Sequence, residues 1–148
     1  MSHSHGKVFI HIVFSTKNRM NFFQNHEFRK RMHAYLAGIV RARDCIPIEI
    51  GGYSDHVHAL IGLANDLSIA EVTKEMKRVS TPWVNGQTCN CGRFSWQEGY
   101  SAFSVSESVL PRVVEYIINQ EEHHRRMTFD EELRVLLSPR SGCAATGG

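Results

Sequence analysis

The stretch YSDHVHALIGL, Tyr53–Leu63, places His56 and His58 one residue apart inside an otherwise apolar run. This pattern predicts a β-strand, in which residues two apart point to the same side. The two imidazoles then project together, while Val57 and Ala59 point to the opposite face, against a core. Two imidazoles held side by side on a strand form half of a divalent metal site. Two ordinary histidines on a sheet surface are the alternative.

The segments around this strand predict an alternation of strands and helices. Strands are expected over 7–16, 45–55, 56–63 and from Tyr100 onward, and helices over 26–43, 68–85, 108–127 and 128–137. Ser68 followed by Glu71 predicts a capping box at the start of the second helix. The order is the split βαβ, or ferredoxin-like, α+β arrangement: an antiparallel sheet with helices on one face plus C-terminal helices. We expect the histidine face of the sheet to be open.

The composition is that of one ordinary folded domain. The chain has 148 residues, 42% hydrophobic and 22% charged, with a formal net charge of +2, so any nucleic-acid binding must come from local placement of charge. We expect a single domain, 1–148, with a core from about 7 to 137 and a flexible tail over 138–148. No apolar run approaches the roughly 20 residues that span a bilayer, and no signal peptide is evident, which predicts a cytoplasmic protein with no membrane partner.

The four cysteines are Cys45, Cys89, Cys91 and Cys143. Their spacing is not that of a secreted disulfide framework. Cys89 and Cys91 form a CNC pair that is either half of a zinc site or part of an ordinary loop, because zinc usually takes four well-spaced ligands.

A second candidate pair lies on the helix expected over 108–127, where Tyr116 and Gln120 are four residues apart and share one face. A tyrosine hydroxyl can attack a phosphodiester when a metal ion neutralises the phosphate, and Gln120 offers an oxygen ligand for that ion. The alternatives are a packed aromatic ring and a solvated amide.

Two neighbouring residues are weighed against these candidates. Tyr100 is a rival nucleophile, but it lies in a strand context without a nearby amide at helical spacing. Asp55 adjoins the histidines and points the other way in a regular strand, so support of the histidines or of a turn is expected rather than metal ligation.

Basic residues form three groups. Candidate DNA contacts are Lys17, Arg19, Lys74, Lys77 and Arg78, with solvated faces as the alternative. His123 and His124, with the arginines that follow, lie near the predicted end of the Tyr116 helix, where the helix dipole favours cations, and a DNA role there is secondary.

Four segments together resemble a known family. HIVFSTKNR at 11–19, DHVHALIGL at 55–63, FSWQEGYSAFSVS at 94–106 and YIINQEEHH at 116–124 are similar, in the same order, to the single-tyrosine HUH transposases. The similarity is strongest to the insertion-sequence-200-like transposases, relatives of the REP-associated tyrosine transposases. It covers the chain from about residue 7 to about residue 137.

The resemblance implies a ferredoxin-like homodimer that cleaves and joins single-stranded DNA near a hairpin, through a covalent 5′-phosphotyrosine and a free 3′-OH. By this resemblance Tyr116 is the nucleophile, and His56, His58 and Gln120 hold a divalent metal ion, Mg²⁺ or Mn²⁺. In the family the tyrosine helix can complete the site of the partner subunit, so Tyr116 acts either in its own chain or in the partner.

Other functions stay open at this point. A non-catalytic module for single-stranded nucleic acid would bind through the sheet without forming an adduct. A metal-dependent phosphodiesterase would use water and need the histidines but not the tyrosine. A domesticated REP-type nuclease would be chemically active without mobilising its own element.

Overall fold

The computed structural model describes residues 5–87 and 93–138. Four strands, β1 (Phe9–Ser15), β2 (Ile46–Gly52), β3 (His56–Gly62) and β4 (Ser101–Val105), form one antiparallel sheet in the order β2-β3-β1-β4. This order places β1 and β3 in the centre of the sheet, where their near-continuous apolar runs are buried. The predicted ferredoxin-like α+β arrangement is confirmed.

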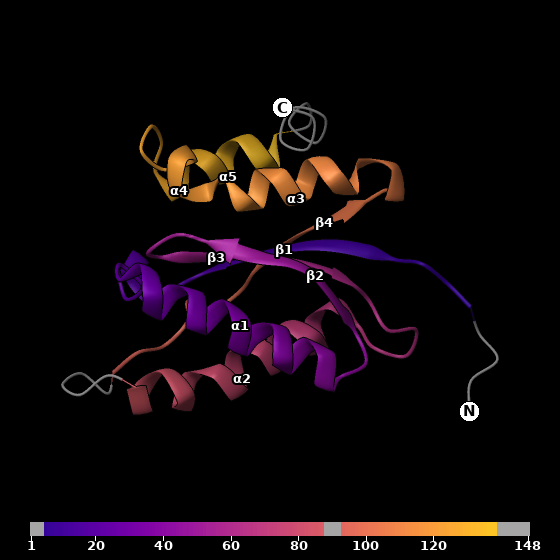
Figure 1. Cartoon of the computed structure of the whole chain (residues 1–148), viewed down its shortest axis with the longest axis horizontal. Coiled ribbons are helices and arrows are strands. Elements are labelled where there is room, and N and C mark those ends of the chain that lie inside the picture. Colours follow the sequence, from indigo (N-terminus) through magenta and orange to yellow (C-terminus); the bar gives the residue numbers. More distant parts are fainter. Residues whose placement is uncertain (1–4, 88–92, 139–148) are drawn as a thin grey trace.

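Helices cover both faces of the sheet (Figure 1). Helices α1 (His26–Ala42) and α2 (Ile69–Gln87) lie on one side, and α3 (Leu110–Ile118), α4 (Gln120–His123) and α5 (Phe129–Leu137) lie on the other. Two short 3-10 turns, η1 (Lys17–Arg19) and η2 (Glu107–Val109), complete the elements. The expectation of an open histidine face is therefore wrong, because the three C-terminal helices cover it.

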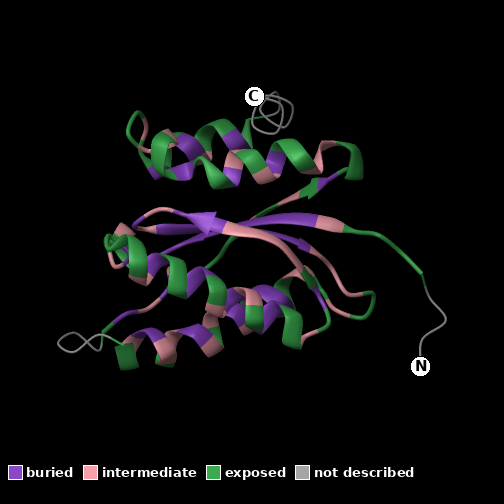
Figure 2. Cartoon of the chain, in the orientation of Figure 1, coloured by how far each residue is buried: buried purple, intermediate pink, exposed green. Residues whose placement is uncertain are grey.

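The main core lies between the sheet and the first two helices, where the buried positions of Figure 2 face one another. Alternate residues of the central strands point into it, Ile12 of β1 and Ala59 of β3 among them. Leu36 of α1 and Met76 of α2 fill the helix side, and both are fully buried. The period-two and helical apolar patterns of the sequence meet here.

Side-chain caps define the helix starts. The predicted capping box is present, since the backbone N–H of Glu71 donates to Ser68 Oγ at 3.0 Å and that of Ser68 donates to Glu71 Oε1 at 2.9 Å. Thr128 and Glu131 form a second capping box at the start of α5. This box fixes where α5 begins and hence which of its residues face the sheet.

The helix predicted over 108–127 is not continuous. Helix α3 ends at Ile118, Asn119 has φ −90° and ψ 17°, and α4 covers only Gln120–His123. The chain then turns back at 124–128, where His124 Nδ1 donates to the carbonyl of Met127 at 2.8 Å. The turn folds α5 back over the sheet.

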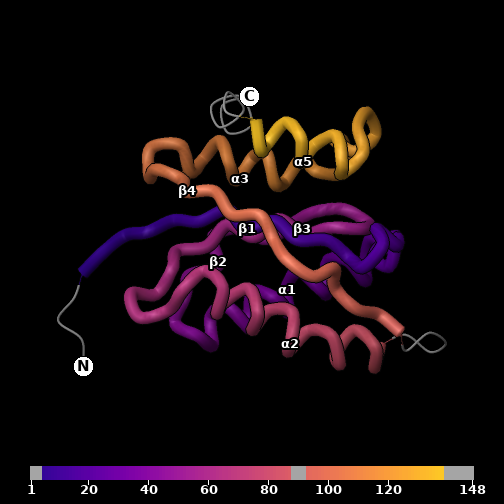
Figure 3. Tube along the Cα trace, turned by 180° about the vertical axis from the view of Figure 1, so that it is seen from behind, coloured from indigo at the N-terminus to yellow at the C-terminus, as the bar shows by residue number. Residues whose placement is uncertain are grey.

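Residues 93–100 connect α2 to β4 along the edge of the sheet, as Figure 3 shows from behind. Thr16 pairs with Trp96 in an isolated antiparallel bridge, which ties this segment to the end of β1. The segment thus runs between the layer of α2 and the layer of the C-terminal helices.

Some predictions fall outside the described residues. These are the zinc half-site at Cys89 and Cys91 and, apart from Ser138, the flexible tail over 138–148. Over 5–87 and 93–138, no helix combines the length and the hydropathy that crossing a bilayer requires.

Candidate metal and nucleophile site

Strand β3 presents both histidines of the HVH motif to the layer of C-terminal helices. His56 and His58 are each 0% exposed. Their Nε2 atoms both point at Glu132: His56 Nε2 lies 3.4 Å and His58 Nε2 lies 3.3 Å from Glu132 Oε1. His56 Nε2 also lies 2.9 Å from Gln120 Oε1. The two imidazoles therefore converge on one point above the sheet.

The Nδ1 atom of each imidazole forms a hydrogen bond with a second side chain. His56 Nδ1 donates to Asp55 Oδ1 at 2.8 Å, and His58 Nδ1 lies 2.7 Å from His11 Nε2. His11 shares a face of β1 with Val13, which is the direct partner of His58 in the sheet. Burial and the neighbouring His58 lower the pKa of His11 to about 3, so His11 is neutral. Metal binding through Nε2 requires that both Nε2 atoms be free of protons, so an ion would replace the protons that face Gln120 and Glu132.

Glu132 of α5 occupies the centre of this cluster and is 1% exposed. Its Oε1 accepts from His124 Nε2 at 2.9 Å and faces His58, while its Oε2 accepts from Gln120 Nε2 at 2.9 Å and from the Tyr116 hydroxyl. Burial alone would raise the pKa of Glu132, but His58 and hydrogen bonds from the surrounding histidines hold it well below its usual range. The carboxylate is therefore ionised.

Tyr116 lies beside the histidines of its own chain. Its ring is 5.7 Å from the His58 ring, edge to face, and its hydroxyl donates to Glu132 Oε2. Burial and the negative charge of Glu132 raise the pKa of the Tyr116 phenol well above its ordinary value. The phenol is thus protonated at neutral pH and needs a nearby positive charge to become a nucleophile.

Two glycines let the backbone approach closely enough to build the site. Gly52 has φ +145°, and a Cβ there would collide with the carbonyl oxygen of His56. At Gly51 a Cβ would lie 2.7 Å from Ile117 Cγ2 of α3. Glycine at both positions allows the β2–β3 turn to seat His56 while α3 packs directly on β2.

The donor set fits a divalent cation. Ligand atoms of His56, His58 and Glu132 lie within 4.8 Å of one another, and Gln120 Oε1 adds a fourth donor beside them. Two imidazole nitrogens with carboxylate and amide oxygens suit Mn²⁺, and the oxygens also suit Mg²⁺. Asp55 and His11 supply the hydrogen bonds that usually orient metal-binding histidines.

The structure brings together four residues that the sequence nominated: His56, His58, Tyr116 and Gln120. Asp55 is placed as expected, behind His56 and not among the converging donors. Tyr100, the rival nucleophile, lies elsewhere: it is 43% exposed and lines a hollow beside α2.

Sequence reasoning missed three members of the cluster: Glu132, His11 and His124. A signal for Glu132 is present, since it lies on one helical face with Phe129 and Leu136, which are both buried. A lone carboxylate on an apolar face is a candidate ligand.

The five basic residues predicted to contact DNA differ in their partners in the structure. Arg19 pairs with Asp130 at 2.8 Å, Arg78 with Glu75 at 2.9 Å, and Lys77 Nζ donates to two backbone carbonyls. Lys17 and Lys74 are exposed, and neither side chain has a polar partner within residues 5–87 and 93–138. DNA contact by these five residues stays a prediction.

The cluster is shielded from solvent. His56, His58, Gln120 and Glu132 are each at most 1% exposed, and the Phe129 ring of α5 stacks on His56 with centroids 4.3 Å apart. In this arrangement α5 and its Phe129 ring close the Nε2 atoms off from solvent.

A known protein family matches most of the chain. Residues 4–120 match the model of a family described as "Transposase IS200 like". This range includes both histidines, Tyr116 and Gln120, whereas Glu132 lies beyond it. No curated protein sequence matches the chain at a significant level.

Two solved structures share the fold. A proposed transposase from Deinococcus radiodurans R1 is 22% identical with a TM-score of 0.61, over 81% of this chain and 95% of that one. A REP-associated tyrosine transposase bound to a REP hairpin is 16% identical, also with a TM-score of 0.61, over 94% of this chain and 89% of that one. Since the family match spans most of the sequence, this chain belongs to the IS200-like transposase family, a family of enzymes.

Proposed function

We propose that this protein is a transposase for single-stranded DNA that cuts and joins DNA near a hairpin, with Tyr116 as nucleophile. The observation that carries the proposal is the position of the Tyr116 hydroxyl, which donates to the same carboxylate that faces His56 and His58. Membership of the transposase family supports the reaction class, and a similar protein is bound to a REP hairpin.

In the proposed reaction the Tyr116 oxygen attacks phosphorus and forms a P–O bond, while the bond from phosphorus to the 3′ oxygen breaks. The products are a 5′-phosphotyrosine and a 3′-OH strand end. A 3′-OH can later attack the phosphotyrosine and restore Tyr116, so joining needs no separate energy source. Glu132 Oε2, which already accepts the hydrogen bond, is positioned to take the hydroxyl proton.

His56, His58, Gln120 and Glu132 would hold the metal ion, Mg²⁺ or Mn²⁺. When bound, the ion supplies positive charge that neutralises the phosphate and favours the ionised phenol. The two oxygens of Glu132 have different neighbours, since Oε1 faces the imidazoles and Oε2 faces the phenol. Tyr116 acts in its own chain in this proposal, and a homodimer would bring two complete sites together.

Incubation with a labelled single-stranded oligonucleotide carrying the hairpin that flanks the gene tests the proposal. Denaturing electrophoresis should show a covalent protein–DNA band that forms with Mn²⁺ or Mg²⁺ and is lost with EDTA. Cleavage without a covalent band would instead identify a phosphodiesterase that uses water. Binding with neither product would identify a non-catalytic module.

A further inference from the structure

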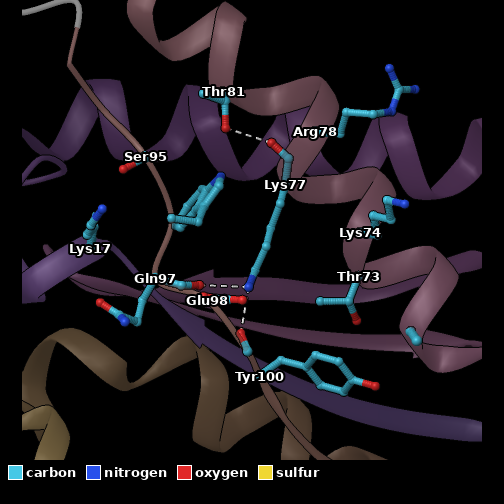
Figure 4. A pocket seen from close by; sticks show the side chains of 13 residues that line it. Lys17, Thr73, Lys74, Lys77, Arg78, Thr81, Ser95, Gln97, Glu98 and Tyr100 are labelled. Atoms are coloured by element: carbon cyan, nitrogen blue, oxygen red, sulfur yellow. Dashed lines mark hydrogen bonds between the residues drawn. The ribbon is translucent and has the colours of Figure 1, made fainter.

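A second feature of the molecule lies away from the metal cluster, between α2 and the segment 95–100. It is a hollow of about 660 Å³, lined by one face of α2, by residues 95–100 and, at one side, by Lys17 of η1 (Figure 4). Its volume is that of a small-molecule or nucleotide site.

The rim of the hollow is positively charged. Lys17 and Lys74 stand on opposite sides of it in Figure 4, exposed and without a polar partner among the described residues. Arg78 adds a third exposed cation, although it also pairs with Glu75. Among the described residues that line the hollow, Glu98 is the one with an acidic side chain. The net positive charge of the lining therefore favours binding of a polyanion.

The floor of the hollow is already fixed. Lys77 crosses it, and its ammonium donates to the carbonyl of Gln97 at 2.8 Å and to that of Gly99 (Figure 4). Trp96 Nε1 donates to Ser80 Oγ at 2.9 Å, which joins the segment to α2 a second time. A ligand would therefore bind to a preorganised surface.

An exposed aromatic ring completes the lining. Tyr100 is 43% exposed at the edge of the hollow, where a ring of this kind can stack against a base. A cationic groove with an aromatic platform is the usual recognition surface for single-stranded nucleic acid.

The hollow is one chain segment away from the metal cluster. Residues 97–100 line it on one side and on the other line a smaller hollow of about 140 Å³, which includes Arg19 and Phe129. Phe129 in turn stacks on His56. A strand lying across 97–100 would run from the cationic hollow toward the cluster.

We infer that the hollow between α2 and residues 95–100 is a subsite for an unpaired nucleotide of the single-stranded DNA that flanks the cleaved bond. Lys17 and Lys74 contact its phosphates, and Tyr100 stacks on its base. This inference rests on the proposed function, because it takes DNA as the substrate.

Fluorescence anisotropy with a labelled dT12 oligonucleotide, in EDTA to prevent cleavage, measures the subsite directly. Replacing Lys17 and Lys74 by alanine together should weaken binding and lower the slope of log K against log salt by about 1.4, the value for two single-strand phosphate contacts. Tyr100→Ala should weaken binding about fivefold or more, and Tyr100→Phe should restore it. The matched control removes two exposed charges elsewhere, Arg41→Ala with Arg134→Ala, and should keep the wild-type slope.

Photocrosslinking of the wild-type chain with dT12 containing 5-iodouracil needs no substitution, and mass spectrometry should place the crosslink on Tyr100. The subsite is overturned if the double lysine variant keeps the wild-type salt slope and affinity and Tyr100→Ala keeps the wild-type affinity. This holds even if the protein cleaves DNA normally. An equal loss of affinity for a blunt hairpin would place duplex in the hollow and also overturn it. If the wild type does not bind dT12 or hairpin DNA at all, the proposed function fails as well.

Discussion

Glu132→Gln is the substitution that tests the organisation of the cluster most sharply. It keeps the shape of the side chain but removes a buried charge that receives hydrogen bonds from Tyr116, Gln120 and His124. The NH2 group of the new glutamine is itself a hydrogen-bond donor, so it would face one of these three donors. Hydrogen bonds to charged groups contribute about 1.5–3 kcal/mol each and are not additive, and breaking a buried charged network typically destabilises by about 3–5 kcal/mol. We expect the free energy of unfolding to fall by about 3 kcal/mol.

Urea unfolding at pH 7 in EDTA measures this loss without interference from metal ions. Glu115→Gln, at an exposed position of α3, is the matched control and should stay within about 0.5 kcal/mol of the wild type. If Glu132→Gln also stays within that margin, the carboxylate does not organise the cluster.

Three further predictions concern the metal, the pH dependence and the assembly. Asp55→Asn weakens the bond that orients His56 and should lower Mn²⁺ affinity about 10–100-fold by calorimetry; unchanged affinity would remove Asp55 from the site. Burial lowers the pKa of His56, but Asp55 and Glu132 outweigh it and raise this pKa to about 9 from 6.5 in the metal-free protein. The folded state therefore binds more protons, so this contribution to stability is full below pH 6.5 and is lost as the pH rises toward 9. Mn²⁺ must displace that proton, so its binding enthalpy at pH 7 should vary with the ionisation enthalpy of the buffer, and equal enthalpies would contradict the assignment. Because β2 and β4 are the sheet edges, we expect a homodimer in sedimentation; a monomer at micromolar concentration would contradict this.

The sheet and its helices were predictable because the apolar periods are regular. The near-continuous apolar runs of β1 and β3 and the capping box of Ser68 and Glu71 each depend on neighbouring residues alone. The same local logic placed His56 and His58 on one face. It failed at Asn119, where the helix breaks before the turn that brings Glu132 of α5 within hydrogen-bond distance of Gln120.

The candidate site was predictable only in part for the same reason. Tyr116 and Gln120 share a helical spacing that the sequence shows, whereas Glu132 joins them through the turn at 124–128. The sequence places His124 near a helix end, where the dipole favours a cation, but the turn directs its Nε2 to Glu132. The burial of the histidines also depends on where α5 packs, which no local pattern specifies.

The central claim is that the Tyr116 hydroxyl attacks phosphorus, and the comparison of wild type with Tyr116→Phe tests it most directly. Phenylalanine keeps the ring beside His58 and removes only the hydroxyl. We expect that the variant folds and binds hairpin DNA yet forms no covalent adduct with Mn²⁺. In the wild type, digestion and mass spectrometry should place the nucleotide on the peptide that contains VVEYIINQ. Undiminished cleavage by Tyr116→Phe, or a nucleotide attached to Tyr100, would contradict it.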